Sequence, residues 1–283
     1  MQLTLKDHIL EIIIEQAMTS DDLFQKYHIG KKQRYFYYQN GFYVNQIQKK
    51  QNVLLHPNDI VTIKMLDEKD DISFDQQPID ICYEDDIILI INKPAYLLVH
   101  SDGQNTSHTL YNRVAYYYHQ HHIPCKVRAI HRLDYETSGL IFFCKLAFFQ
   151  PLFDHLLSEK KIYREYQAIC SGILKKDITI QQRIGRDRHH ASKMRISSTG
   201  KEACTHVKVL SHHHNQTLIQ CRLETGRTHQ IRVHLASIHH PLVNDKLYGT
   251  SSKGRMLLHA FRLSFFHPIS HEFKVVECNA PFK

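Results

Sequence analysis

A nine-residue polar loop carries the side chains best suited to chemistry. It runs from His131 to Gly139 between two apolar, strand-like runs, 127–130 and 140–144. A carboxylate on such a loop is held by a rigid scaffold while a substrate can still reach it. Asp134 lies at the centre of this loop, and we expect it to act as a nucleophile or a general base.

A second polar segment, residues 225–232, opens a helix that follows a strand. A guanidinium from this segment could pair with Asp134, keep it ionised and orient it. A purely structural ion pair between two loops explains the same residues, so both interpretations stay open. Asp134 and Glu136 could also be the paired carboxylates of a glycoside hydrolase, but that hypothesis gives the second segment no clear role.

These two segments need a scaffold, and strand patterns dominate the chain around them. Apolar strand-like runs cover 87–92, 163–170 and 218–223, and a hairpin is predicted around 212–216. Helical spacing occurs at 152–157 and at 231–238, where Pro241 follows. Because the strands do not alternate regularly with helices, the pattern predicts an α+β fold built on a mainly antiparallel, mixed sheet.

The chain also divides into parts. Residues 67–77 are acidic and almost free of apolar side chains, which indicates a linker before Pro78. The predicted organisation is a small module at 1–67, a linker at 68–77 and a large domain at 78–283. In the module, helices are predicted at 21–27 and 31–39, and strands at 42–45 and 60–65. The second helix carries three cations that could contact a polyanion: Lys31, Lys32 and Arg34.

Composition narrows the class of protein. Lys and Arg number 36 against 28 Asp and Glu, and this formal charge of +8 suits a nucleic acid. The seven cysteines are widely scattered with no Cys-x-x-Cys spacing, which favours free thiols and a cytoplasmic location. The apolar run 139–149 is too short to span a membrane and contains Lys145, so no membrane partner is expected.

Histidine is frequent, with 23 residues, several of them in short clusters. None of these clusters has a cysteine at zinc spacing, and there is no His-Glu-x-x-His helix. Composition bias therefore explains the clusters best, and we expect no dedicated metal site.

Several segments together resemble one family. HRLDYETSGL at 131–140 closely resembles the signature loop of the RluA-type pseudouridine synthases. Four further segments resemble the family's other motifs and follow in its order: 83–100, 162–172, 224–249 and 256–268. The likeness spans about residues 80–283, and several ordered motifs are far more specific than one short pattern.

The resemblance implies roles for individual residues. Asp134 would be the catalytic carboxylate, and Arg227 would be its ion-pair partner. Tyr166 would stack on the flipped uracil, although an ordinary core tyrosine is the simpler alternative. Leu257 or Leu258 would line the uracil pocket.

On the RNA side, the resemblance implies that His131 and Arg132 contact the substrate. Arg132 would fill the space that the flipped uridine leaves, or else would contact a phosphate. The chain departs from the family at Tyr96, where glycine is usual, and at Tyr135, where a basic residue is more common. These departures bear on loop geometry and substrate contacts.

The implied activity is isomerisation of uridine to pseudouridine in structured RNA, with no cofactor or metal. Residues 40–65 resemble a small RNA-binding domain shared with a ribosomal protein of the small subunit. This likeness favours large-subunit ribosomal RNA over transfer RNA as the substrate, and we expect the enzyme to act as a monomer. The alternative is a non-catalytic RNA-binding or ribosome-assembly factor, against which the intact Asp134, Tyr166 and Arg227 argue.

Overall fold

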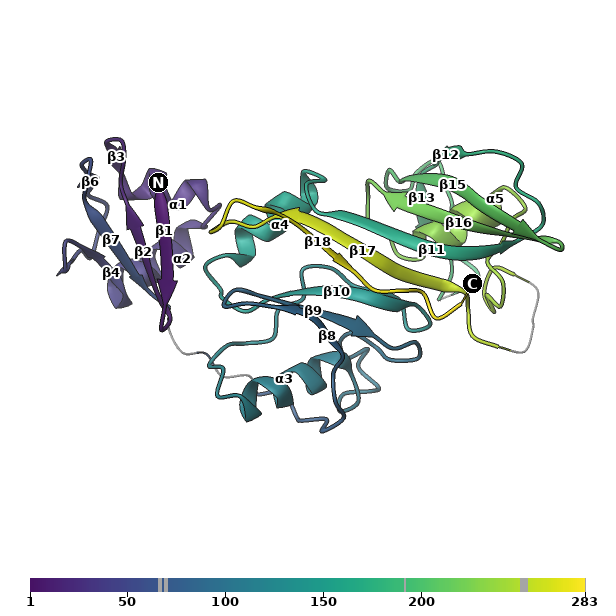
Figure 1. Cartoon of the computed structure of the whole chain (residues 1–283), viewed down its shortest axis with the longest axis horizontal. Coiled ribbons are helices and arrows are strands. Elements are labelled where there is room, and N and C mark those ends of the chain that lie inside the picture. Colours follow the sequence, from purple (N-terminus) through teal and green to yellow (C-terminus); the bar gives the residue numbers. More distant parts are fainter. Residues whose placement is uncertain (66–67, 69–70, 191, 250–253, 283) are drawn as a thin grey trace.

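The computed structural model describes residues 1–283 except 66–67, 69–70, 191, 250–253 and 283. An N-terminal unit lies at one end of an elongated molecule, and a large sheet runs through the rest (Figure 1). The predicted domain boundary after residue 67 and part of the predicted linker fall outside the described residues, so this division stays a prediction. No helix in the described part is long and apolar enough to cross a membrane.

The N-terminal unit is a five-stranded sheet with two helices, and its strand order is β1-β2-β7-β4-β5. Its core comes from alternation, because Leu10 and Ile12 are fully buried while Glu11 between them is exposed. A capping box between Thr19 and Asp22 starts the first helix. The elements are β1 (Gln2–Lys6), β2 (Ile9–Ile13), β3 (Met18–Thr19), α1 (Ser20–Lys26), α2 (Lys31–Asn40), β4 (Phe42–Val44), β5 (Ile47–Gln48), β6 (Leu54–Leu55) and β7 (Ile60–Lys64).

The large sheet has the order β12-β15-β16-β11-β17-β10-β9-β8, and β18 pairs with β17. All of its pairs are antiparallel except β10 with β17, so the predicted mixed, mainly antiparallel sheet is confirmed. Its strands are β8 (Ile81–Glu84), β9 (Ile88–Lys93), β10 (Ser138–Cys144), β11 (Tyr163–Ser171), β12 (Ile178–Gln181), β15 (Cys204–His213), β16 (Gln216–Leu223), β17 (Leu258–Phe266) and β18 (Phe273–Glu277).

Strand β17 comes late in the chain yet lies in the middle of the sheet. It is hydrogen-bonded to β11 on one side and, in parallel through Ser138 and Gly139, to β10 on the other. A parallel pair places the starts of both strands at the same edge of the sheet. The residues just before β10 and those at the start of β17 therefore meet, although more than a hundred positions separate them in the chain.

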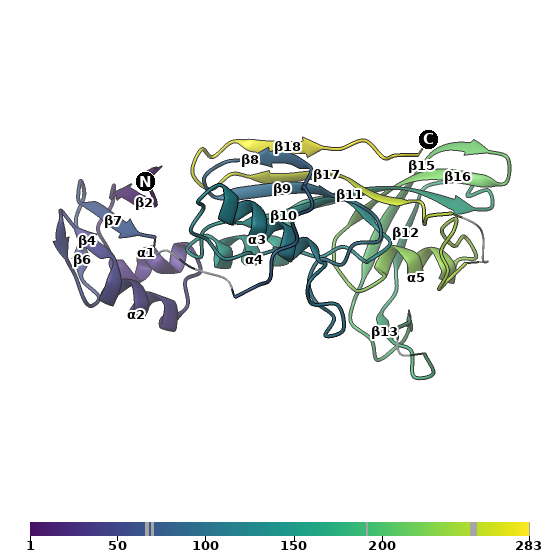
Figure 2. The same cartoon turned by 90° about the horizontal axis from the view of Figure 1, so that it is seen from below.

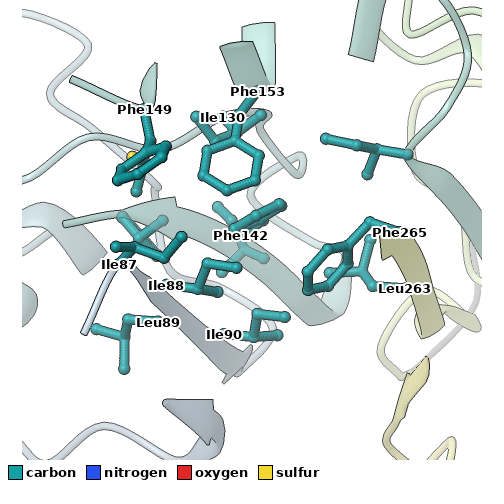
Figure 3. Packing of buried hydrophobic residues seen from close by; sticks show 14 of the residues in the cluster. Ile87, Ile88, Leu89, Ile90, Ile130, Phe142, Phe149, Phe153, Leu263 and Phe265 are labelled. Atoms are coloured by element: carbon teal, nitrogen blue, oxygen red, sulfur yellow. The ribbon is translucent and has the colours of Figure 1, made fainter. Parts of the chain in front are cut away.

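Helices α3 (Leu110–Gln120), α4 (Gln150–Ser158) and α5 (Gln230–Ser237) lie on one side of this sheet (Figure 2). Beneath α4 the aromatic core is dense, with Phe142 packed 4.9 Å from Phe153 and 5.0 Å from Phe265 between ring centroids (Figure 3). A small hairpin of β13 (Ile184–Arg186) and β14 (Met194–Ile196) projects below α5.

The N-terminal unit packs on the larger domain through aromatic side chains. Phe148 is fully buried, and its ring centroid lies 5.0 Å from that of Tyr27. The rings of His28 and His155 stack with centroids 3.6 Å apart. Gln33 donates from Nε2 to the carbonyl of Ala147 at 2.9 Å. The two parts thus share one continuous hydrophobic core.

The structure corrects one predicted strand and adds elements that the pattern did not reveal. The run 127–130 is not a strand; it touches β10 through a single bridge, Ala129 to Phe143. Helix α3 and the β1–β2 hairpin were not predicted. In the predicted linker, Asp75 is buried and accepts a hydrogen bond from Nε of Arg113 at 3.1 Å, so this part of the segment packs on α3.

Candidate active site

A cavity of about 610 Å³ opens where the polar loop, strand β11 and the start of α5 converge. Asp134 lines it from the loop, Tyr166 from β11, Leu258 from β17 and Arg232 from α5. The two polar segments singled out in the sequence therefore face each other across one cavity.

The loop holds Asp134 in a defined position. The backbone amide of Thr137 donates to the backbone carbonyl of Asp134 at 3.1 Å, which closes a turn that begins at Asp134. Directly after the turn, the hydroxyl of Ser138 bonds to Nδ1 of His259 at 2.8 Å and accepts from Nη2 of Arg255 at 2.6 Å. The side chain of Asp134 remains 18% exposed, so it is reachable from the cavity.

Arg232 is the guanidinium that contacts Asp134. Its Nη1 lies 3.7 Å from Oδ2 of Asp134, and its Nη2 lies 3.0 Å from Oε2 of Glu136. It also forms a bidentate pair with the fully buried Asp245, at 2.8 Å for both bonds. Burial alone would lower the pKa of Arg232, but its hydrogen bonds and charge contact with Asp245 outweigh burial and raise it. One buried cation thus organises three carboxylates.

The predicted pairing of Arg227 with Asp134 is wrong. Nε of Arg227 donates to the carbonyl of Glu202 at 2.9 Å, and this half-buried side chain lines the cavity without reaching Asp134. Both arginines belong to the same polar segment, but α5 begins only at Gln230. Arg232 falls within the helix between buried apolar neighbours, whereas Arg227 falls in the preceding loop.

His229 is a second neighbour of Asp134 that was not predicted as a site residue. It has left-handed backbone geometry, with φ of 56°, immediately before α5. Its Nε2 lies 4.0 Å from Oδ2 of Asp134, and its Nδ1 is 2.9 Å from the hydroxyl of Tyr248. Burial lowers the pKa of His229 despite the nearby Asp134, which favours a neutral ring at neutral pH.

Tyr166 and Leu258 form the apolar side of the cavity. Both side chains are buried, and a bulge between Glu165 and Tyr166 shifts the pairing of β11 with β17. Burial raises the pKa of the Tyr166 hydroxyl, so the phenol stays protonated. Of the two predicted leucines only Leu258 lines the cavity, while the backbone of Leu257 bonds to Ile169 and Val243.

The predicted RNA-contact residues divide into two groups. His131 and Arg132 both line the cavity, the first buried and the second exposed. Burial lowers the pKa of His131 to about 3, so its ring is neutral, and its Nε2 accepts from the amide of Phe142 at 3.3 Å. Arg164, a buried cation that also lines the cavity, was not predicted as a site residue.

The second group lies on α2, away from the cavity lining. Lys31 and Lys32 are exposed at the start of that helix. Arg34 instead pairs with Asp21 at 3.3 Å and donates to the carbonyl of Ile29 at 3.1 Å. The two lysines remain available to a polyanion, whereas Arg34 already has protein partners.

Lys93 is a buried cation below the loop. Its Nζ donates to the carbonyls of Pro94 at 2.9 Å and Leu97 at 2.8 Å, and it reaches that of Tyr135 at 3.5 Å. Burial lowers the pKa of Lys93 to about 7, against a smaller opposing effect of Asp134. The amine of Lys93 therefore links the backbone that follows β9 to the backbone of the loop at Tyr135.

One cluster brings metal-ligand side chains together although no such site was expected. The ligand atoms of Cys204, His206 and Glu224 lie within 4.8 Å of one another. The carboxylate of Glu224 is already occupied, by Nζ of Lys160 at 2.6 Å and Nε2 of His206 at 2.6 Å. These hydrogen bonds, first that of Lys160, lower the pKa of Glu224 to about 2. A surface charge network therefore accounts for the cluster.

A mixed sheet with an acid–arginine cluster in a cavity defines the pseudouridine synthase type of fold, and comparisons with known proteins agree. The family described as RNA pseudouridylate synthase matches residues 87–237. The chain belongs to this family. Its members are isomerases that act on RNA, so the enzyme class expected from the sequence is confirmed.

Individual relatives are similar over most of the chain. An uncharacterized RNA pseudouridine synthase of Bacillus subtilis, YhcT, is 42% identical over 84% of this chain and 80% of its own length. The ribosomal large subunit pseudouridine synthase D of Neisseria meningitidis serogroup B is 39% identical over 78% of this chain and 63% of its own. Human RNA pseudouridylate synthase domain containing 1 superposes with a TM-score of 0.61 and 27% identity, over 74% of this chain and 86% of its own.

Proposed function

We propose that this enzyme isomerises uridines of large-subunit ribosomal RNA to pseudouridine, with Asp134 as its catalytic carboxylate. The observation that carries the proposal is the position of Asp134 at a cavity of about 610 Å³, beside the buried guanidinium of Arg232. Relatives named for pseudouridine synthesis in the large ribosomal subunit support this choice of RNA. We further propose that the enzyme works in the cytoplasm as a monomer, without a cofactor or metal.

The proposed reaction breaks the bond between C1′ of the ribose and N1 of uracil, turns the base and joins C1′ to C5. The C5 hydrogen leaves as a proton and N1 gains one, so the product is an isomer of uridine. Asp134 would act on the sugar or the base, as carboxylates do in glycosyl chemistry. Arg232 offers a positive charge 3.7 Å from that carboxylate and fixes its orientation. Because the base is retained and no redox change occurs, the reaction requires no group beyond these side chains.

The cavity walls suit a freed pyrimidine. Tyr166 would stack on the uracil, and Leu258 would close the apolar side. A uridine in folded RNA must first leave its stack, at a cost of a few kcal/mol. Arg132, exposed beside the cavity, would occupy the vacated space.

The proposal is tested by replacing the carboxylate. Asp134→Asn keeps the shape of the side chain and is expected to reduce pseudouridine formation to background while folding and RNA affinity are retained. The measurement is tritium release from RNA that carries labelled uridine. Asp154→Asn removes another carboxyl group of the same cavity and should keep activity within a few-fold. Turnover by Asp134→Asn at the wild-type rate would refute the assignment.

The N-terminal unit is proposed to bind the RNA backbone through α2. Lys31 and Lys32 are exposed, so replacing both with glutamine removes two charges without disturbing packing. We expect weaker RNA affinity and a salt dependence whose logarithmic slope is smaller by about 1–2. Lys175→Gln with Lys176→Gln, two exposed lysines in the loop between β11 and β12, is the matched control. An unchanged slope would show that α2 is not an RNA anchor.

A further inference from the structure

Two exposed tyrosines, one within the loop that carries Asp134 and one next to it, take no part in the function described so far. Tyr96 is 44% exposed and Tyr135, which directly follows Asp134, is 48% exposed. Their ring centroids lie 5.7 Å apart with an interplanar angle of 67°. Single exposed aromatic residues are common, but an adjacent pair next to a catalytic residue calls for a partner.

The backbone fixes this pair in place. The amide of Tyr96 donates to the carbonyl of Tyr135 at 2.7 Å, and the same carbonyl lies 3.5 Å from Nζ of Lys93. Tyr96 has a φ of 63°, in the left-handed region that bulky residues rarely adopt. A strained tyrosine that remains 44% exposed is not fully explained by packing, because its burial offsets only part of the strain.

The surroundings point to a nucleic acid as the ligand. Arg132 is exposed two residues before Asp134, and Arg255 reaches the end of the same loop, where its Nη2 donates to the hydroxyl of Ser138 at 2.6 Å. Aromatic faces flanked by arginines are how proteins bind single-stranded RNA, the rings stacking on bases and the cations contacting phosphates.

We infer that Tyr96 and Tyr135 form a stacking platform for an unpaired nucleobase adjacent to the target uridine. The inference rests on the proposed function, since it is the eversion of the uridine that leaves its neighbour without a stacking partner. Half of the platform belongs to the loop that carries Asp134, because Tyr135 is the next residue after Asp134. It therefore positions the RNA relative to the carboxylate without touching the reacting atoms.

The test removes the rings and follows RNA affinity. Tyr96→Gly and Tyr135→Ala should each raise the KM and the Kd for a large-subunit ribosomal RNA fragment by about 5- to 150-fold, the range for loss of one stacked base. Since the platform binds substrate and transition state alike, kcat should change little. Tyr96→Phe and Tyr135→Phe keep the rings and should restore wild-type values.

Matched controls separate stacking from a merely structural role. Phe266 and Phe273 form a similar exposed pair, 59% and 49% exposed with centroids 5.0 Å apart. Phe266 lies eight positions along β17 from Leu258, roughly 26 Å at strand spacing. Phe266→Ala should leave the KM unchanged. Tyr96→Gly should also keep its stability, because glycine relieves the strained φ, whereas a structural role predicts a loss.

A substrate variation identifies the ligand. Replacing each neighbour of the target uridine in turn with an abasic nucleotide should weaken wild-type binding at one position and leave the Tyr96→Gly variant insensitive there. The platform would be refuted if both tyrosine variants had the wild-type KM and Kd. It would also be refuted if the abasic substitutions weakened binding equally in the wild type and in both variants. Measuring Kd also in an Asp134→Asn background keeps this test independent of turnover, so failure of the proposed reaction and failure of the platform are distinguishable.

Discussion

At the scale of single residues, Arg232 determines the geometry of the site. Its guanidinium is 1% exposed and holds Asp134, Glu136 and the fully buried Asp245 together. A bidentate pair needs the planar fork of arginine, which lysine does not offer. The carboxylate of Asp134 thus receives only the outermost contact of a cation that is mainly committed to Asp245.

Arg232→Met is expected to cost about 3–5 kcal/mol of unfolding free energy, because it leaves the buried carboxylate of Asp245 without its partner. Arg227→Met, at the half-buried arginine of the same segment, removes one hydrogen bond to a backbone carbonyl and should cost only about 0.5–1.5 kcal/mol. Urea denaturation of both variants checks the pair. Equal stability of the two variants would contradict the assigned role of Arg232.

The sequence predicted Asp134, Tyr166 and a leucine of the pair 257–258 as neighbours, and the structure brings Asp134, Tyr166 and Leu258 to one cavity. It did not identify the correct arginine, because both candidates stand in one polar segment and only the starting point of α5 separates them. His229 was missed for a related reason, since its place beside Asp134 depends on a left-handed turn that no spacing rule predicts.

At the scale of elements, the contact between β10 and β17 positions the polar loop that carries Asp134. Gly139 makes this contact possible, because a Cβ there would overlap the backbone of Ala260. Its φ of 113° is also unfavourable for any other residue.

Gly139→Ala should therefore destabilise the protein by more than about 3 kcal/mol, from backbone strain and steric overlap together. Gly103 is the matched control, because its φ is 93° but no other atom lies within 4 Å of the position that a Cβ would take. Gly103→Ala isolates the backbone effect, for which about 1–2 kcal/mol is expected. Thermal or urea unfolding distinguishes them, and a loss of similar size in both would show that the close approach to Ala260 is unimportant.

The elements themselves were partly predictable. Apolar runs predicted β9 and β10 well, because strands buried on both faces contain few polar residues. Strands β11 and β16 were also predicted, although both carry polar residues among the apolar ones. Helix α3 was missed, as its Tyr116, Tyr117 and His119 obscure the apolar spacing. The order of the strands could not be predicted, because nothing local in β17 indicates that it pairs with β10 and β11.

At the scale of the whole molecule, the stacked rings of His28 and His155 join the N-terminal unit to the large domain. Burial lowers the pKa of His28 in the packed state, and the neighbouring His155 lowers it further. When the N-terminal unit and the large domain separate, the pKa of His28 returns to the usual histidine value of about 6.5. Protons therefore bind the separated state more readily than the packed state as the pH falls below about 6.5, and acidification weakens the packing.

We expect hydrogen exchange of the segment around Phe148 and Phe149 to increase between pH 7.5 and pH 5 beyond the intrinsic pH effect, because their burial depends on this packing. His28→Gln removes the titrating group and should abolish that acid-dependent increase. His56→Gln, an exposed histidine elsewhere in the N-terminal unit, should not. An identical pH response in all three proteins would exclude His28 as its source.

The central place of β17 also governs when the enzyme can first act. During synthesis, the ribosome releases Asp134 with β8 to β10, and later Tyr166 and Arg232 with β11 to α5. These are two incomplete half-sheets, which only the arrival of β17 unites. A nascent chain that stalls before Leu258 holds Asp134, Tyr166 and Arg232 but lacks the strand that joins their half-sheets, so we expect it to form no pseudouridine.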